Sequence, residues 1–286
     1  GRIREDGGDR ERAQPAQVKV FPTRSMAAAA AEASDMKFTD RTQSMKVVIV
    51  GGVAGGASCA ARLRRLDEKA EILMVERGPY VSYANCGLPY HISGVIEKEA
   101  SLLVASEQMF RGFFRVEVRT NCEAISVSPQ RKTVELRNVA TGEVTSESYD
   151  KLVLAPGAAS VRPPLPGIDL PGIFQVRTVP DVREIREWMA RGTEFLAGMF
   201  NYTGIQFAKP PRRAVVIGGG FIGLETAENL IHAGFEVTLL EMLDQVLAPL
   251  DREFARLVEE HLKKHGVGLA LGDGVTLANP ITIGAN

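Results

Sequence analysis

The chain has 286 residues, of which 45% are hydrophobic, so it can bury a substantial core, and two domains are a reasonable expectation. Its formal net charge is −1 and no apolar run approaches the roughly 18 residues that span a bilayer, so neither nucleic acid nor a membrane is expected as a partner. The three cysteines include no CxxC pair and form no ligand pattern with the four histidines, so we expect no metal site and a cytoplasmic setting.

Residues 1–44 are not expected to fold. They mix Gly, Arg and Asp at irregular spacing and sustain no hydrophobic period. Their acidic residues argue against an organellar transit peptide, which is rich in Arg and poor in acids. We therefore predict a disordered leader, either an extension or non-native upstream sequence, and place the start of the folded chain at Met45.

A strand, a glycine-rich loop and a helix are predicted next. Residues 46–50 form a buried strand that runs directly into Gly51, and residues 71–76 form the following strand. Helical spacing predicts an inward face and a solvent-facing side for this helix. The inward residues are Ala57, Ala60, Leu63 and Leu66, and the residues in solvent are Arg62, Arg64 and Arg65. Cys59 shares the inward face and is predicted to be a core residue.

The stretch over residues 82–90 is centred on Cys86. Leu88-Pro89-Tyr90 predicts the first turn of a short helix, where Pro needs no amide partner. The helix N-terminus would then face Cys86 and favour the thiolate, which is the nucleophilic form. The alternative is that Cys86 is a small core residue, as free cysteines usually are. This stretch alone leaves both open.

Residues 106–111 predict a short helix capped by Ser106, and the alternation over residues 116–136 is that of short antiparallel strands. Cys122 lies there and is predicted to be structural. Residues 151–155 are apolar enough to rejoin a parallel sheet. The proline-rich residues 161–167 are the expected domain boundary.

A second nucleotide-binding unit is predicted after that boundary. Asp181 is expected to cap a helix, and residues 193–211 show no clear period and look like an insertion. The regular elements that follow are strands over 214–217, 237–241 and 267–271, a helix over 221–233 closed by Gly234, and a helix from Asp251 with Phe254, Leu257, Val258 and Leu262 on one face.

Residues 218–223 satisfy the GxGxxG fingerprint between a strand and a helix, and Glu241 ends the next strand. The glycines let the backbone approach a pyrophosphate at the helix N-terminus, and the acid accepts hydrogen bonds from ribose hydroxyls. A carboxylate at Glu241 should repel the 2′-phosphate of NADP, so NADH is the predicted coenzyme. The alternative is a tight turn without a ligand.

The first loop is imperfect, because Val53 replaces the middle glycine, but Glu76 again ends the next strand. We predict an α/β fold with two Rossmann-like three-layer nucleotide-binding domains, the first carrying an inserted antiparallel β segment. One such loop is compatible with many functions. Two of them, with Cys86 just beyond the first acid, narrow the choice to flavin-linked disulfide chemistry.

Residues 82–90, together with the two loops, resemble the pyridine nucleotide-disulfide oxidoreductases. The likeness is to the single-cysteine branch, which holds coenzyme A disulfide reductase, persulfide reductases and NADH oxidases, and the motif is closest to the first. The resemblance to the family covers residues 45–275 apart from the insertion. It implies an FAD-binding domain over 45–160 and an NAD-binding domain over 161–286. The second FAD-binding segment and the dimerisation domain of full-length members are not recognisable, so the chain looks truncated at its C-terminus. The resemblance implies a homodimer for full-length members and leaves the oligomeric state of this chain open.

The resemblance also implies the residues of the site. Cys86 is catalytic and Asn85 orients the sulfur or the flavin. The residues implied for FAD are Gly51, Gly52, Gly56, Glu76, Ala155 and Gly157, and those implied for NADH are Gly218, Gly220, Gly223 and Glu241. NADPH is the less favoured coenzyme, and coenzyme A is expected as substrate or ligand.

No second cysteine stands near Cys86, so it must cycle as a mixed disulfide with coenzyme A, a persulfide or a sulfenic acid. The expected function is NADH-dependent reduction of a disulfide or persulfide through flavin. The alternatives are an NADH oxidase or peroxidase that uses a Cys86 sulfenate, and an inactive nucleotide-binding fragment. His91 is a catalytic acid or, as we favour, a packed or surface residue. Arg62 and Arg65 contact coenzyme A phosphates or, as we favour, only solvent.

Overall fold

The computed structural model describes residues 44–190 and 212–275. The predicted leader, except for Ser44, and the predicted insertion over 193–211 lie outside the described residues. In the part that is described, no helix has the length and apolar character needed to cross a membrane.

The first parallel sheet has the strand order β3-β2-β1-β7, with every neighbouring pair parallel. Its strands are β1 (Lys46–Val50), β2 (Glu71–Val75), β3 (Glu117–Arg119) and β7 (Lys151–Leu154). The strands predicted over 46–50, 71–76 and 151–155 are thus confirmed to within a residue. The prediction of antiparallel pairing was wrong for β3, which joins β2 in parallel because the helical elements between residues 85 and 112 form a crossover connection between the two strands.

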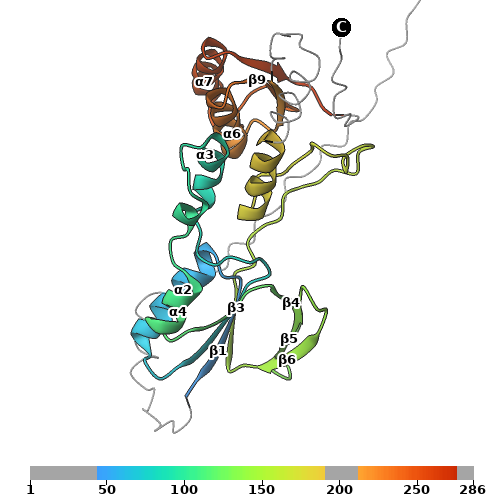
Figure 1. Cartoon of the computed structure of the whole chain (residues 1–286). Coiled ribbons are helices and arrows are strands. Elements are labelled where there is room, and N and C mark those ends of the chain that lie inside the picture. The colour runs from blue at the N-terminus through green and yellow to red at the C-terminus, as the bar shows by residue number, and fades with distance from the viewer. Residues whose placement is uncertain (1–43, 191–211, 276–286) are drawn as a thin grey trace, which may run out of the picture. The chain divides into compact units, whose positions relative to one another are not determined.

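Alternation along β1 explains why this sheet is covered on both faces. Val47 and Ile49 belong to a core cluster with the helical residues Ala57 and Phe110, whereas Val48 belongs to another cluster. The helices are α2 (Ala54–Leu66) and α4 (Glu107–Gly112), and the opposite face carries an antiparallel sheet of β4 (Cys122–Ser128), β5 (Thr133–Asn138) and β6 (Val144–Ser148) (Figure 1). The predicted antiparallel insert and the Ser106 cap, which accepts from the Met109 amide, are confirmed.

Arg64 corrects the predicted orientation of α2. Its side chain was expected in solvent but is only 8% exposed, whereas Leu66, expected inward, is 67% exposed. The guanidinium donates to the carbonyl oxygens of Phe114 and Arg115 at 2.8 Å each, and also to those of Asp67 and Glu68. Four acceptors therefore compensate for its burial and fix the end of α2 to the loop before β3.

Arg64→Met is expected to lower the free energy of unfolding by about 2–4 kcal/mol, because carbonyl groups lose a charged donor while the apolar stem is kept. Urea denaturation followed by circular dichroism measures the change. The matched control is Arg65→Met, since Arg65 is exposed and donates to Ala61 of its own helix. Equal destabilisation by both variants would contradict the role given to Arg64.

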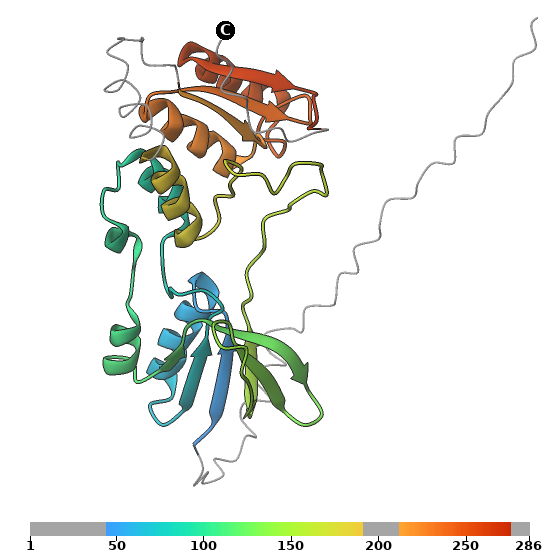
Figure 2. The same ribbon diagram turned by 45° about the vertical axis from the view of Figure 1, so that its right-hand side comes forward.

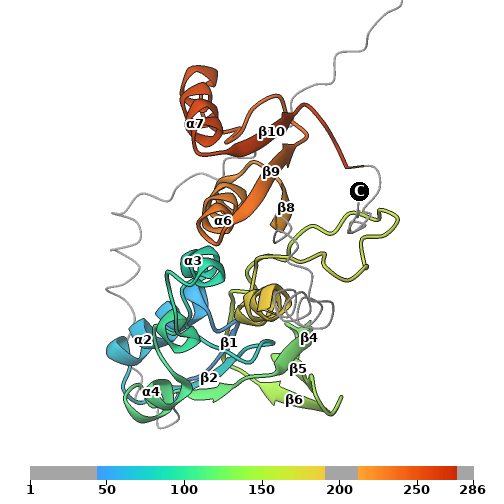
Figure 3. The same cartoon turned by 45° about the horizontal axis from the view of Figure 1, so that its top comes forward.

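The second parallel sheet has the order β10-β9-β8, with β8 (Arg212–Ile217), β9 (Phe235–Glu241) and β10 (Val267–Leu271). Helix α6 (Phe221–His232) packs on β8 and β9, and α7 (Arg252–Lys264) packs on β10 (Figure 3). These elements were all predicted, and the α/β fold class with its two Rossmann-like units is confirmed.

The buried face of α7 differs from the prediction. Phe254 and Leu257 are 59% and 62% exposed, and the helix instead buries Ala255, Glu259 and Leu262. Glu259 faces inward because its carboxylate is compensated, as Oε1 lies 3.3 Å from Nη1 of Arg252 and accepts from the Val246 amide. The apolar pattern alone could not show that a carboxylate would take an inward position.

A third group of helical elements comes from two parts of the sequence, the connection between β2 and β3 and the connection between β7 and β8. It comprises the 3-10 turn η1 (Asn85–Gly87), α3 (Leu88–Ser93), the 3-10 turn η2 (Glu99–Leu102) and a helix over residues 179–190. Helix α3 packs on α6 (Figure 2). Both α3 and the helix over 179–190 contribute to the core cluster that contains Leu239 of β9.

The helix over 179–190 begins differently from the prediction. Asp181 was expected to be the cap, but it occupies the third helical position, and its Oδ2 accepts from the Thr178 amide at 2.8 Å. The Asp181 amide donates to Oγ1 of Thr178 at 3.4 Å. This reciprocal pair is a capping box with Thr178 as the cap.

Candidate active site

Cys86 lies in the turn η1 directly before α3, and Pro89 stands in the first turn of that helix as predicted. The Cys86 side chain is exposed, so the alternative of a small core residue is wrong. The expectation that the helix N-terminus favours the Cys86 thiolate stays a prediction.

The start of the cysteine motif is fixed to the first glycine loop. The Ser82 amide donates to the Gly52 carbonyl oxygen at 2.9 Å, and the Ser82 carbonyl accepts from the Val104 amide at 2.7 Å. Ser82 has a φ of +48°, a left-handed conformation that is uncommon for residues other than glycine. The chain accepts this conformation at the residue where it turns from the loop towards Cys86.

A cavity of about 220 Å³ lies beside Cys86. It brings together the cysteine turn, the residues before the helix over 179–190, and the first two turns of α6. Its lining consists of Asn85, Cys86, Leu88, Pro89, Val176, Arg177, Ile222 and Glu225. Asn85 and Cys86 were predicted site residues. Arg177 and Glu225, which place opposite charges at this cavity, were missed, and the position of Glu225 two residues after the fingerprint was the only signal for it.

Asn85 carries a buried hydrogen-bond acceptor that no protein group satisfies. Its Oδ1 atom is buried without a hydrogen-bond partner, and no other buried side-chain atom in the described part of the chain shares this state. A buried acceptor left unpaired costs about 1–3 kcal/mol, so a bound donor at this position would recover that energy. The residue beside the thiol is thus prepared to accept a hydrogen bond from a bound group.

Two tyrosines have altered acidity around this site. Burial raises the pKa of Tyr83, and the nearby Glu76 carboxylate adds to that shift. The Glu225 carboxylate raises the pKa of Tyr90, with smaller contributions from desolvation, Glu228 and Cys86. Both hydroxyls therefore keep their protons at neutral pH and remain hydrogen-bond donors.

The first glycine loop, residues 51–56, contacts Ala155 and Glu76, which were predicted to bind FAD together with it. A Cβ on Gly51, whose φ is +96°, would lie 2.0 Å from the Ala155 carbonyl oxygen, and one on Gly56 would lie 1.7 Å from the Gly51 oxygen. Oε2 of Glu76 accepts from the Gly52 amide at 2.8 Å. Gly157 follows, with Nη2 of Arg177 3.3 Å from where its Cβ would stand. Five of the six residues predicted for FAD therefore gather around one loop, and Gly157 stands two residues beyond Ala155.

The second glycine loop repeats this construction. A Cβ on Gly223 would lie 1.9 Å from the Gly218 carbonyl oxygen, and Oε2 of Glu241 accepts from the Gly219 amide at 2.6 Å. A Cβ on Gly218 or Gly220 would meet no protein atom within 4 Å. The loop thus keeps its backbone tight against α6 and leaves open space beside Gly218 and Gly220, which fits a pyrophosphate at the helix N-terminus.

His91 and the α2 arginines were given two possible roles each. His91 is 4% exposed, its Nδ1 lies 2.7 Å from the Ile96 carbonyl oxygen, and it does not line the Cys86 cavity. These observations support a packing role for His91 rather than a role as a catalytic acid. Arg62 and Arg65 are exposed on α2, and contact with coenzyme A phosphates stays a prediction for both.

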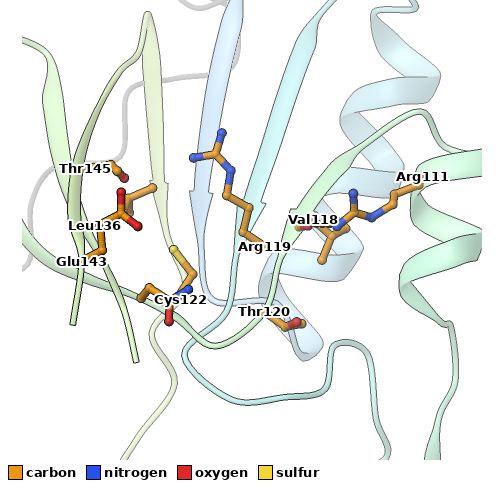
Figure 4. Close-up of a pocket in the computed structure, with 9 residues that line it drawn as sticks. Arg111, Val118, Arg119, Thr120, Cys122, Leu136, Glu143 and Thr145 are labelled. Atoms are coloured by element: carbon orange, nitrogen blue, oxygen red, sulfur yellow. Dashed lines mark hydrogen bonds between the residues drawn. The ribbon is translucent and has the colours of Figure 1, made fainter. Parts of the chain in front are cut away.

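A larger cavity of about 390 Å³ lies away from Cys86, between α4, β3 and the antiparallel sheet (Figure 4). Cys122 lines it, and burial raises the pKa of this thiol, which disfavours the nucleophilic form. Its two arginines are both paired, Arg111 with Glu107, and Arg119 with Glu117 and Glu147. Despite its size, this cavity offers no activated group, and the prediction that Cys122 is structural stands.

Residues 45–281 match the family model described as pyridine nucleotide-disulphide oxidoreductase, which is well over half of the chain. The chain belongs to this family. The resemblance inferred from the cysteine motif and the two glycine loops is thereby confirmed.

Relatives within this family carry several names. A coenzyme A disulfide reductase of Staphylococcus epidermidis is 33% identical over 234 residues, which are 82% of this chain and 49% of that protein. An NADH oxidase of Enterococcus faecalis is 34% identical over 233 residues, which are 81% and 48%. The crystal structure of reduced CoADR-RHD from Bacillus anthracis is 46% identical, with a TM-score of 0.74 over 83% of this chain and 40% of that one. The chain spans about half the length of the curated relatives it matches.

Proposed function

We propose that this chain carries the nucleotide-binding and thiol-bearing parts of an FAD-dependent oxidoreductase, which passes electrons from NADH to Cys86 and on to a disulfide such as coenzyme A disulfide. One observation carries the proposal. The exposed Cys86 shares a cavity with Ile222 and Glu225, which belong to the helix that opens with the NADH fingerprint. A small-molecule disulfide is the proposed partner.

The residues present fit both nucleotides, and the family depends on FAD and NAD(H). The proposed FAD-binding domain spans 45–160 and would hold the cofactor through its glycine loop, Glu76 and the turn at Gly157. The proposed NAD-binding domain spans 161–286 and would hold NADH through Gly218, Gly220, Gly223 and Glu241. When bound, FAD would take a hydride from NADH and deliver two electrons to sulfur.

Cys86 performs the sulfur chemistry. Its thiolate attacks one sulfur of the substrate disulfide, a mixed disulfide forms, and the other sulfur leaves as a thiolate that takes a proton from solvent. Two electrons and a proton then release the second thiol and return Cys86 to its thiolate. Asn85, next in the chain, offers an unpaired Oδ1 to orient the bound groups.

Two alternatives from the same family use the same thiol. A persulfide in place of the disulfide leaves the attack at Cys86 unchanged. An NADH oxidase or peroxidase would oxidise Cys86 to a sulfenic acid instead, and the similarity to the E. faecalis NADH oxidase supports it. A chain that binds nucleotides without turnover is the third alternative, because it spans only half the length of its relatives.

Anaerobic NADH is expected to bleach the flavin absorbance of the chain reconstituted with FAD, and NADPH should do so at least about tenfold more slowly at equal concentration. The reason for the preference is that Glu241 places a carboxylate where the extra phosphate of NADPH would lie. Stopped-flow absorbance measures both rates.

Each possible result decides a separate point. Faster bleaching by NADPH would make the argument from Glu241 wrong. A chain that binds no FAD, or whose flavin neither coenzyme reduces, would contradict the proposed function for this chain.

A further inference from the structure

The segment that carries Cys86 is held at both of its ends by two arginines of one helix. In the helix over residues 179–190, Arg183 and Arg186 are three residues apart and therefore on the same side. Arg183 contacts Tyr80 and Glu99, and Arg186 contacts the region from His91 to Glu97. In the sequence these contacts lie on either side of the motif over residues 82–90.

The contact of Arg183 has the geometry of a strong ion pair. Its Nε donates to Oε2 of Glu99 at 2.8 Å and its Nη2 donates to Oε1 at 2.6 Å, which is a bidentate arrangement. The Tyr80 hydroxyl donates to the same Oε1 at 2.8 Å, and the guanidinium carbon lies 5.8 Å from the centre of the Tyr80 ring. The hydrogen bond from Arg183 lowers the pKa of Glu99, so the carboxylate remains charged at neutral pH.

The contact of Arg186 is made mainly with main-chain oxygens. Its Nη1 donates to the carbonyl oxygens of His91 at 2.9 Å and Glu97 at 3.2 Å. His91 stands near the end of α3, where a cation is favourable to the exposed carbonyl groups. Nη1 also lies 2.9 Å from Nδ1 of His91, and this nitrogen can accept from Arg186 or donate to Ile96 but not both.

The same helix also shapes the wall opposite Cys86. Val176 and Arg177, which line the cavity, immediately precede the Thr178 cap of this helix. Its apolar side chains Val179 and Val182 share a core cluster with Leu88 and Ile92 of α3. One element therefore sets the positions of both the cysteine segment and part of the cavity it faces.

We propose that Arg183 and Arg186 are positioning residues, an arginine clamp that fixes the Cys86 segment against the wall of its cavity. The effect of the clamp on turnover rests on the proposed function, but its effect on the accessibility of the thiol does not. Without the clamp, α3 keeps its apolar contacts and the hydrogen bond from Ser93 to Asn229 of α6 at 2.6 Å. The segment then loosens but does not detach.

The test uses Arg183→Gln and Arg186→Gln in the full chain. Mass spectrometry of the Cys86 peptide gives the rate of its alkylation by iodoacetamide, which should rise at least about threefold because the loosened segment presents the exposed sulfur to the reagent from more directions. Amide hydrogen exchange should accelerate about tenfold over residues 82–97 and remain unchanged in β1 and β9. The matched control is Arg213→Gln, since Arg213 makes an exposed ion pair with Glu236 at 3.1 Å.

Turnover and a charge swap separate positioning from folding. Each variant should lose about tenfold in kcat for coenzyme A disulfide while KM for NADH stays within about twofold, because the thiol is misplaced but the NADH loop is not. The double variant Arg183→Glu with Glu99→Arg should recover most of the loss, since it restores an ion pair of opposite polarity.

The clamp is overturned if both Gln variants match the wild type in alkylation and in exchange over 82–97. It is equally overturned if exchange accelerates alike in β1, β9 and the cysteine segment, which would mean global destabilisation. If alkylation responds as expected but the wild-type chain fails to reduce any disulfide with FAD and NADH, the clamp stands and the proposed function fails.

Discussion

Cys86→Ser is expected to reduce NADH-dependent turnover of coenzyme A disulfide by at least about 1,000-fold. A serine hydroxyl is not ionised at neutral pH, and it cannot form the mixed disulfide that the flavin would reduce. The measurement is NADH consumption together with free thiol release in the presence of FAD. NADH binding should be unchanged, since Cys86 is not among the atoms close to the glycines of the loop over residues 218–223.

Cys59→Ser and Cys122→Ser serve as the controls for this variant. Both thiols are half-buried, Cys59 against the core on the helical face of the first sheet and Cys122 against the core on the other face. They should keep turnover within about threefold. Full disulfide reductase activity in Cys86→Ser would rule out the proposed chemistry. Wild-type turnover of oxygen or peroxide, without disulfide reduction, would favour the sulfenate alternative.

Gly223→Ala is expected to weaken NADH binding at least about tenfold and to lower the free energy of unfolding by about 1–3 kcal/mol. The added Cβ would stand 1.9 Å from the Gly218 carbonyl oxygen, so the backbone of the loop must move away from α6. Calorimetric titration with NADH and thermal denaturation measure the two effects.

Two further glycines in the chain separate packing from ligand contact. A Cβ on Gly220 meets no protein atom, so Gly220→Ala should fold with wild-type stability but bind NADH less tightly, because the methyl group enters the space assigned to the pyrophosphate. A Cβ on Gly112 of α4 also meets nothing, and Gly112→Ala should change neither quantity. Wild-type NADH affinity in both loop variants would mean that residues 218–223 form a tight turn without a ligand.

The sequence was sufficient for the features that depend on short-range patterns. Both strands that run into the glycine loops, the helices behind them and the acids Glu76 and Glu241 were predicted where the structure places them, although Val216 is the one buried residue of β8. Each of these depends on residues within a few turns of one another, so periodicity and glycine spacing suffice. The exposure of Cys86 fits the reactive thiol favoured by the two loops.

Features that depend on distant partners could not be predicted in this way. Arg64 is buried because the loop at Phe114 and Arg115 supplies acceptors, and these lie about fifty residues later. Glu225 meets Cys86 only through the packing of α3 on α6, and Arg177 meets it only because the helix over 179–190 shares a core cluster with α3. Each looks like an ordinary surface charge in the sequence, since helical spacing describes a face but not what will cover it.

Because Cys86 has no partner cysteine, the redox potential of its proposed oxidised form would depend on its surroundings. With Cys59 and Cys122 placed in other clusters, the proposed oxidised form bonds Cys86 to half of a substrate molecule rather than to a second cysteine of the chain. Its reduction releases a free thiol, so its midpoint potential must fall by about 30 mV for every tenfold rise in that thiol, as for any two-electron couple with one released product. An internal cysteine pair lacks this dependence. Under the proposed function, the resting oxidation state of Cys86 would therefore depend on the concentration of the thiol that its own reduction releases.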